Sequence, residues 1–278
     1  MRITCLVDNT AATGSALWAE HGLSVLIESA GHYLLWDTGQ SGTVLLHNLQ
    51  TLHLDDVPLS GLALSHAHYD HTGGLDALLT RYGSLPIYAH TSLFTERFSR
   101  RGEETREIGL RHAAELQHRA HFSLSTEAQA LAPGVWTSGD ISPRPYPQGS
   151  SPHHWIQRAG RWLPDPYEDD LSLILRTREG LVLLCGCCHA GLRNTLRAAR
   201  ARHQGPLRAI VGGTHLVTAD DTEIGAVIAA LHQEGLPQLY LNHCTGNKAL
   251  FALQQAFGDL VRPCPAGTVL EFPDEEGS

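Results

Sequence analysis

The chain has 278 residues, of which 42% are hydrophobic and 18% charged, and its formal net charge is −9. An acidic balance without a block of lysines and arginines argues against an extended nucleic-acid or anionic-membrane surface. No apolar run approaches the roughly 20 residues that cross a membrane, and residues 1–9 lack the pattern of a secretion signal. We therefore expect a cytoplasmic protein with a small-molecule substrate, no membrane association and no nucleic-acid partner; a homodimer is left open.

The first half of the chain is rich in expected strands. Short apolar runs that end in turn residues predict strands at 2–8, 23–29, 33–39, 59–66 and 86–90. Leucines at helical spacing predict a helix at 41–52, and a short helix that ends at Gly83 is expected at 73–83. A polar stretch with spaced apolar residues predicts a third helix at 102–119.

Arginines gather just before and within that third helix: Arg97, Arg100, Arg101, Arg106 and Arg111. Such a run of charge is typical of a solvated helix face, which is the interpretation favoured here. The acidic net charge does not exclude the alternative, which is a local basic pocket.

The second half of the chain alternates strands and helices. Residues 141–169 are rich in proline, glycine and aromatic residues and predict an irregular, lid-like loop. A β-hairpin is expected at 171–186, followed by helices at 190–203, 221–235 and 247–258 and by strands at 207–213, 238–243 and 267–272. Two β-rich layers with helices outside them form a four-layer αββα sandwich of the α/β class. We expect a single domain over residues 1–278.

Residues 65–71 read SHAHYDH and place three histidines and an aspartate within six positions. Strand side chains alternate, so His66 and His68 lie on one side of a strand end. The chain then turns at residues 72–74, which allows Asp70 and His71 to point back to the same place. Imidazole and carboxylate are ligands of zinc, iron and manganese. This segment predicts the start of a metal site whose remaining ligands come from distant strands.

SHAHYDH followed by TGGL resembles the signature of the metallo-β-lactamase superfamily. Further segments are similar, in order, to the branch usually labelled 7,8-dihydropterin-6-methyl-4-(β-D-ribofuranosyl)-aminobenzene 5′-phosphate synthase-like. These segments are AEHGLSVLIES (19–29), LLWDTGQSG (34–42), DPYEDDLSLIL (165–175), CGCCHAGLRNTL (185–196), VGGTHL (211–216) and NHCTG (242–246). The resemblance covers nearly the whole chain and implies the metallo-β-lactamase fold.

The resemblance also implies the remaining metal ligands. His189 in CGCCHAG and His243 in LNHCTG match ligand positions of the family. Three ligands for each of two divalent ions, most often zinc with manganese or iron as alternatives, leave coordination positions for water or substrate. One ion would take His66, His68 and His189, and the other Asp70, His71 and His243.

The chain departs from the superfamily after the strand that ends at residue 185. Members commonly have Gly-Asp there, with the aspartate bridging the two ions, whereas this chain has Gly186-Cys187. The bridge is absent, replaced by a hydroxide, or supplied by the thiolate of Cys187; Asp170 is a further candidate ligand.

Other residues are candidates for supporting roles. We expect Asp70 to help orient a nucleophile, and His215 to act as a ligand or as a donor to substrate or an oxyanion. His21 and Asp37 are candidates for orienting a ligand imidazole. Asn9, Thr38 and His90 are weaker candidates for the same task. Aromatic residues that could stack on a flat ring are Tyr146, Trp155, Trp162 and Tyr167.

These residues favour a metal-dependent hydrolase with two ions, in which a metal-bound hydroxide attacks a small phosphorylated or pterin-like substrate. The same site could instead serve a dihydropterin-type synthase. Two alternatives stay open. The cysteines beside His189 are compatible with di-iron redox or persulfide chemistry, and a metal-binding sensor without catalysis is the other. Metal content and turnover of a chromogenic phosphodiester distinguish the three.

Overall fold

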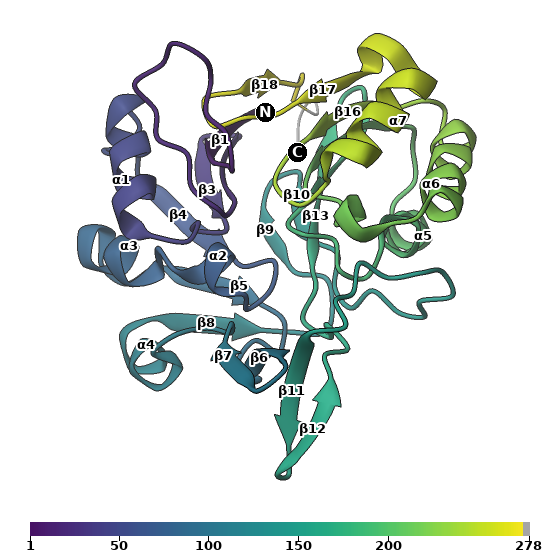
Figure 1. The fold of residues 1–278 in the computed structure, drawn as a ribbon. Coiled ribbons are helices and arrows are strands. Elements are labelled where there is room, and N and C mark those ends of the chain that lie inside the picture. Colours follow the sequence, from purple (N-terminus) through teal and green to yellow (C-terminus); the bar gives the residue numbers. More distant parts are fainter. Residues whose placement is uncertain (275–278) are drawn as a thin grey trace.

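Strands that are apolar on both faces require cover on both sides. In β14 (Gly180–Cys185), Val182 and Leu184 face one hydrophobic core while Leu181 and Leu183 face another. The computed structural model, which describes residues 1–274, provides this cover with two packed sheets and outer helices (Figure 1). The expected four-layer αββα sandwich is confirmed.

The first sheet has seven strands in the order β18-β1-β2-β3-β4-β5-β8. Its neighbours β3, β4, β5 and β8 run parallel, so their carboxyl ends meet at one edge. The strands are β1 (Arg2–Val7), β2 (Ser24–Ser29), β3 (His32–Trp36), β4 (Leu59–Ala63), β5 (Pro86–Ala89), β8 (His121–Leu124) and β18 (Val269–Glu271).

The second sheet also has seven strands, in the order β17-β16-β15-β14-β13-β10-β9. Strands β14, β15, β16 and β17 are parallel and bring a second set of carboxyl ends together. Besides β14, the strands are β9 (Ala130–Ala132), β10 (Val135–Thr137), β13 (Ser172–Thr177), β15 (Leu207–Gly212), β16 (Gln238–Leu241) and β17 (Val261–Pro263).

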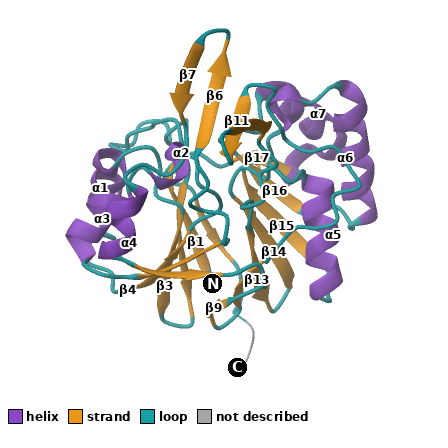
Figure 2. Cartoon of the chain, turned by 90° about the horizontal axis from the view of Figure 1, so that it is seen from below, coloured by secondary structure: helices purple, strands orange, loops and turns teal. Residues whose placement is uncertain are grey.

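Helices cover the outer face of each sheet (Figure 2). The first sheet is covered by α1 (Gly42–Thr51), α3 (Leu75–Tyr82) and α4 (Ala113–Arg119), which enclose a core with Leu45 and Leu78. The second is covered by α5 (Leu192–Arg202), α6 (Asp221–Gln233) and α7 (Asn247–Phe257). Short helical turns are α2 (Tyr69–Thr72), η1 (Leu216–Thr218) and η2 (Gly258–Leu260). Among the described residues, none of these helices is long and apolar enough to span a membrane.

A small third sheet corrects two predictions. Its order is β12-β11-β6-β7, with β6 (Arg97–Arg101), β7 (Glu104–Glu107), β11 (His154–Arg158) and β12 (Arg161–Pro164). The predicted helix 102–119 is wrong in its first half, where the chain forms β7, and right only at α4. The segment 141–169 is not wholly irregular, since it contributes the hairpin β11–β12. Figure 2 shows β6 and β7 extending beyond the sandwich.

Arg97 is buried, in contrast to the expected solvated helix face. Its Nε lies 3.2 Å from Oδ2 of Asp165 and its Nη2 lies 2.6 Å from Oδ1 of Asp169. The other oxygen of Asp169 accepts the backbone N–H of Ala67, at 2.8 Å. Propensity favoured a helix here, but the buried ion pairs and the aromatic side chains of β11 and β12 favour a strand.

We predict that Arg97→Ala lowers the free energy of unfolding by about 3–5 kcal/mol, because it leaves two buried carboxylates without their cation. Urea denaturation measures the change. Arg161→Ala is the matched control, because Arg161 is an exposed arginine of the same small sheet. Equal midpoints for the two variants would contradict a structural role for Arg97.

Candidate metal centre

The candidate ligands lie where the carboxyl ends of the two sheets meet. His66 and His68 follow β4, and His189 follows β14. The structure places one ring nitrogen of each of these three histidines within 4.8 Å of the others. All three side chains are buried. Segments 121 residues or more apart in the chain therefore form one compact donor group.

Hydrogen bonds orient this first group. Ser65 Oγ lies 2.8 Å from Nδ1 of His66, and Nδ1 of His189 donates to the carbonyl of Gly149 at 2.7 Å. Nε2 of His66 lies 3.0 Å from Nδ1 of His68, and Nε2 of His189 is buried and has no hydrogen-bond partner among the described residues. Buried polar atoms are normally paired, so two ring nitrogens that face each other and a third that is unpaired fit a cation between them.

The protonation state of the first group also suits a cation. Burial, together with the repulsion of neighbouring imidazoles, lowers the pKa of His66 and His189 well below the usual value. Burial lowers the pKa of His68 in the same way. Neutral imidazole is the form that binds a metal ion. The three side chains are ready to bind without first losing a proton.

A second donor group lies beside the first, around the carboxylate of Asp70. Its Oδ2 lies 3.2 Å from Nε2 of His21, 3.4 Å from Nε2 of His243 and 3.6 Å from Nε2 of His71. The Nε2 atoms of His71 and His243 are 3.1 Å apart. Burial would raise the pKa of Asp70, but the adjacent His71 and His243 hold it well below its usual value. An ionised carboxylate among imidazoles fits a divalent cation.

Asp37 and Asn9 fix the two histidines of the second group. Asp37 Oδ2 lies 2.7 Å from Nδ1 of His71, which leaves Nε2 of that ring facing the centre. Burial would lower the pKa of His71, but the carboxylates of Asp37 and Asp70 outweigh burial and raise it. Asn9 lies 3.1 Å from Nδ1 of His243 through its Oδ1 and donates to the carbonyl of the same residue.

Two cysteines complete the wall of the centre. Cys187 Sγ lies 3.2 Å from Nε2 of His71, and it forms one donor group with His66 and His71 and another with His243 and Cys244. Burial raises the pKa of the Cys187 thiol well above its usual value. Cys244 accepts the backbone N–H of His215 through its sulfur, at 3.3 Å. Cys187 thus lies between the two groups, at the place where the family commonly has the bridging aspartate.

Several residues that were candidates for ligand or supporting roles lie outside the donor groups described above. Asp170 Oδ2 accepts the backbone N–H of Ala190 at 2.8 Å, so this aspartate holds the loop that carries His189. Burial raises the pKa of Asp170 to about 7. Thr38 donates its hydroxyl to the carbonyl of His71. His90 accepts the N–H of Ser92 and belongs to neither the groups nor the cavity lining.

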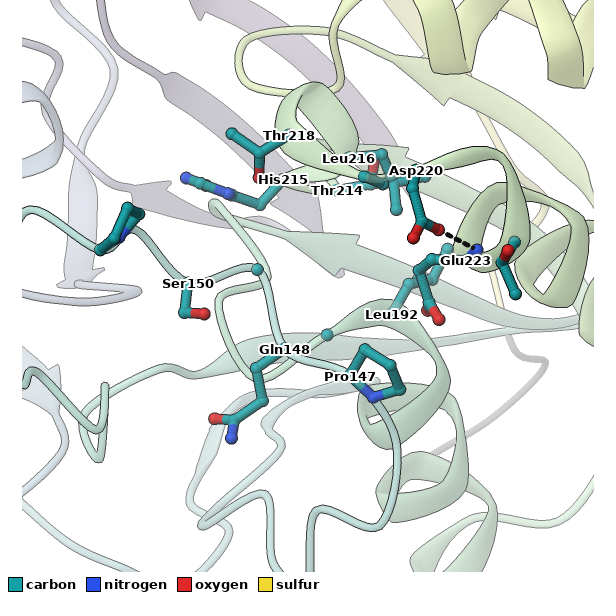
Figure 3. Close-up of a pocket in the computed structure, with 15 residues that line it drawn as sticks. Pro147, Gln148, Ser150, Leu192, Thr214, His215, Leu216, Thr218, Asp220 and Glu223 are labelled. Carbon is teal, nitrogen blue, oxygen red and sulfur yellow. Dashed lines mark hydrogen bonds between the residues drawn. The ribbon is translucent and has the colours of Figure 1, made fainter.

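His215 lies at the boundary between two cavities. A cavity of about 240 Å³ opens onto the centre, and His21, His68, Asp70, His189, His215 and His243 line part of it. On its other side, His215 lines a cavity of about 510 Å³ with Gln148, Ser150, Thr218 and Glu223 (Figure 3). The rings of His215 and His189 are 4.3 Å apart. Burial and the nearby His154 and His243 lower the pKa of His215 to about 4, so it is neutral at pH 7.

The aromatic candidates do not form one stacking platform. Trp155 and Trp162 pack around Arg100, whose guanidinium carbon lies 5.6 Å and 4.4 Å from their ring centroids. Tyr146 packs against Arg193. Tyr167 is buried and stacks on His189 at 4.2 Å, which positions that imidazole.

The pattern of the sequence did not identify two contributors and gave a third too little weight. His154 lies in a polar stretch of the sequence and was not a candidate, yet its ring lies 5.1 Å from that of His68 and it lines the cavity. Cys244 was not singled out, although it follows His243 directly in NHCTG. Asn9 was rated a weak candidate; its position after the first strand is the only signal that pointed to it.

Comparisons with known proteins identify the family of the chain. The profile of the metallo-beta-lactamase superfamily matches residues 17–187. A Methanocaldococcus jannaschii protein named 7,8-dihydropterin-6-methyl-4-(beta-D-ribofuranosyl)-aminobenzene-5'-phosphate synthase is 28% identical over 98% of this chain and 97% of its own.

Solved structures share the fold. The crystal structure of Tm1679, a metal-dependent hydrolase of the beta-lactamase superfamily, has a TM-score of 0.87 and 29% identity, covering 99% of this chain and 100% of that one. The metallo-beta-lactamase fold protein YhfI from Bacillus subtilis has a TM-score of 0.59 at 13% identity, with 97% and 99% covered. The histidine-rich strand ends, the four-layer sandwich and the family profile lead to one conclusion: the chain belongs to the metallo-β-lactamase superfamily.

Proposed function

We propose that the protein is a dinuclear metal-dependent hydrolase. One divalent ion would be held by His66, His68 and His189, and the other by Asp70, His71 and His243. The observation that carries the proposal is the pair of adjacent donor groups: one is buried and neutral, and the other is partly exposed and contains an ionised carboxylate. Zinc suits these ligands best, and manganese or iron are alternatives.

Two such ions, when bound, would lower the pKa of a water toward ~7 and stabilise charge on attacking and leaving oxygens. The chain's own residues would prepare this chemistry. Asp70 would orient the nucleophile, and neutral His215 would hydrogen-bond the substrate from the wall shared by the two cavities. Asp37 and Asn9 would hold the imidazoles of His71 and His243 in place.

For the substrate we propose a small phosphorylated compound with a pterin-like heterocycle. The name of the Methanocaldococcus jannaschii relative, which contains both a dihydropterin and a phosphate, supports this class. The cavity of about 510 Å³ beside His215 has a volume suited to a small organic group. A condensation of the synthase type, in place of hydrolysis, would use the same centre.

A second candidate function is di-iron redox or persulfide chemistry. The specific observation in its favour is the pair of thiols, Cys187 and Cys244, in contact with the donor groups. A visible absorption spectrum of protein reconstituted with iron, compared with turnover of the zinc-loaded or manganese-loaded protein, decides between the two.

We expect zinc-loaded or manganese-loaded protein to hydrolyse bis(p-nitrophenyl) phosphate, and His68→Ala to lower kcat/KM on the order of 100-fold or more, since one donor group loses a ligand. Release of p-nitrophenolate is the measurement. His118→Ala, which removes an exposed histidine of α4, is the control. Absence of turnover with every divalent metal tried, or equal rates for both variants, would contradict the hydrolase proposal.

Metal occupancy is expected to depend on pH differently at the two groups. The pKa of His71 is raised, so a proton competes for its Nε2, whereas the pKa values of His66, His68 and His189 are lowered. Below the pKa of His71, affinity at the second group falls about tenfold per pH unit, because binding releases one proton. Competitive chelator titrations of His189→Ala and His243→Ala from pH 8 to pH 6 would measure this, and equal slopes would refute it.

We expect Asp37→Asn to weaken metal affinity at the second group by about 10–100-fold, because an amide no longer fixes and polarises the ring of His71. The affinity is measured by chelator competition at pH 7.5. Asp259→Asn changes an exposed aspartate and serves as the control. An unchanged affinity in Asp37→Asn, with the fold intact by circular dichroism, would show that Asp37 has only a structural role.

A further inference from the structure

One face of the small β12-β11-β6-β7 sheet is turned toward the metal centre. At its inner end, Arg97 pairs with Asp169, and Asp169 accepts the backbone N–H of Ala67, which lies between two candidate ligands. Next along the sheet, the ring of His154 lies 5.1 Å from that of His68. The inner end of the small sheet therefore contacts the metal centre. Its exposed end, the hairpin β6–β7, extends past the cavity of about 240 Å³.

The strand register aligns charged residues on this face. Residue His154 is opposite Ser99, which is opposite Arg106, and Arg101 is opposite Glu104. Directly paired residues of antiparallel strands point to the same side. The other face carries Phe98 and Arg100, which pack on Trp162. Ser99, Arg101 and Arg106 therefore share the face that carries His154.

These three residues line two adjoining cavities. Ser99, Arg101 and Arg106 line the cavity of about 240 Å³ at the metal centre, and with Glu104 they line a second cavity of about 260 Å³. The shared wall connects the centre to the hairpin β6–β7. A ligand bound at the metal centre can therefore extend along this wall to the hairpin.

Neither the guanidinium of Arg101 nor that of Arg106 has a carboxylate partner among the residues that the structure describes. Arg106 donates through Nη2 to the hydroxyl of Tyr69 at 3.1 Å, and its guanidinium carbon lies 5.1 Å from the centroid of that ring. This contact with a neutral partner holds Arg106 over the cavity while leaving its charge uncompensated. Seven other arginines among the described residues do have carboxylate partners, namely Arg81, Arg97, Arg119, Arg158, Arg193, Arg200 and Arg208.

We propose that Ser99, Arg101 and Arg106 form a subsite for a phosphate monoester group of the substrate, separate from the group that reacts at the metal ions. The proposal deepens the proposed function and rests on it. Arginine presents paired N–H donors that match phosphate oxygens, and the Ser99 hydroxyl adds a third donor. The subsite selects substrates that carry a terminal phosphate at a distance from the reacting bond. Glu104, opposite Arg101, weakens the binding of anions there.

Two matched chromogenic phosphodiesters test the subsite: thymidine 5′-(p-nitrophenyl phosphate) with and without a 3′-phosphate. Arg101→Ala and Arg106→Ala should each raise KM for the 3′-phosphorylated substrate on the order of tenfold, as expected for a lost charged hydrogen bond. Their KM for the substrate without that phosphate should not change. Glu104→Gln should lower KM for the phosphorylated substrate, and Arg161→Ala, an arginine of the same sheet outside both cavities, should change neither.

A binding measurement separates this proposal from the proposed function. Metal-depleted protein is titrated with inorganic pyrophosphate by calorimetry, in wild type and in the double variant Arg101→Ala/Arg106→Ala. Binding by wild type that is lost in the double variant supports the subsite even if no substrate turns over. Equal binding by both proteins, no binding by wild type, or equal effects of the arginine variants on the two substrates would overturn it.

Discussion

The buried carboxylate of Asp37 is the interaction on which the arrangement of the candidate centre depends. Its Oδ1 accepts the backbone N–H of Ser65, and its Oδ2 accepts the Ser65 hydroxyl and lies 2.7 Å from His71. A carboxylate without exposed surface is stable only when its oxygens are hydrogen-bonded. A Cβ on Gly186 would lie 2.3 Å from Ser65, so only glycine lets the end of β14 approach. This contact brings the ligands of the two sheets together.

The small sheet has a buried end that stabilises the fold and an exposed end that we propose binds an anion. Its inner end is held by Arg97 between two aspartates, and its outer end presents two arginines without carboxylate partners among the described residues. The difference is one of solvation: a buried guanidinium needs its carboxylates, whereas one at a cavity mouth remains hydrated until an anion replaces water. The same hairpin can therefore be rigid where it meets the metal centre and open where it meets solvent.

Much of the fold could be predicted from the sequence. Short apolar runs such as β14 predicted the sheets, leucine spacing predicted α1, and a terminal glycine marked the end of α3, because these signals are local in the sequence. The hairpin β6–β7 was missed because its charged residues have no strand-like alternation of apolar side chains. Its conformation depends on pairing with β11, a strand more than 50 residues away, which no local pattern records.

The sequence by itself indicated the family, through its resemblance to the superfamily signature, and it placed four candidate ligands of SHAHYDH within six positions. These residues lie close together because they share one short loop and the turn α2 after β4. The resemblance had already named His189 and His243, and only the tertiary structure decided which other distant side chains lie against the candidate ligands. Asn9 meets His243 across 234 residues, and His154 reaches His68 through the small sheet. His215 and His243 also adopt left-handed backbone conformations, with φ of 45° and 50°. Such conformations are costly for residues with a side chain and persist only where surrounding packing imposes them, so they belong to the folded state.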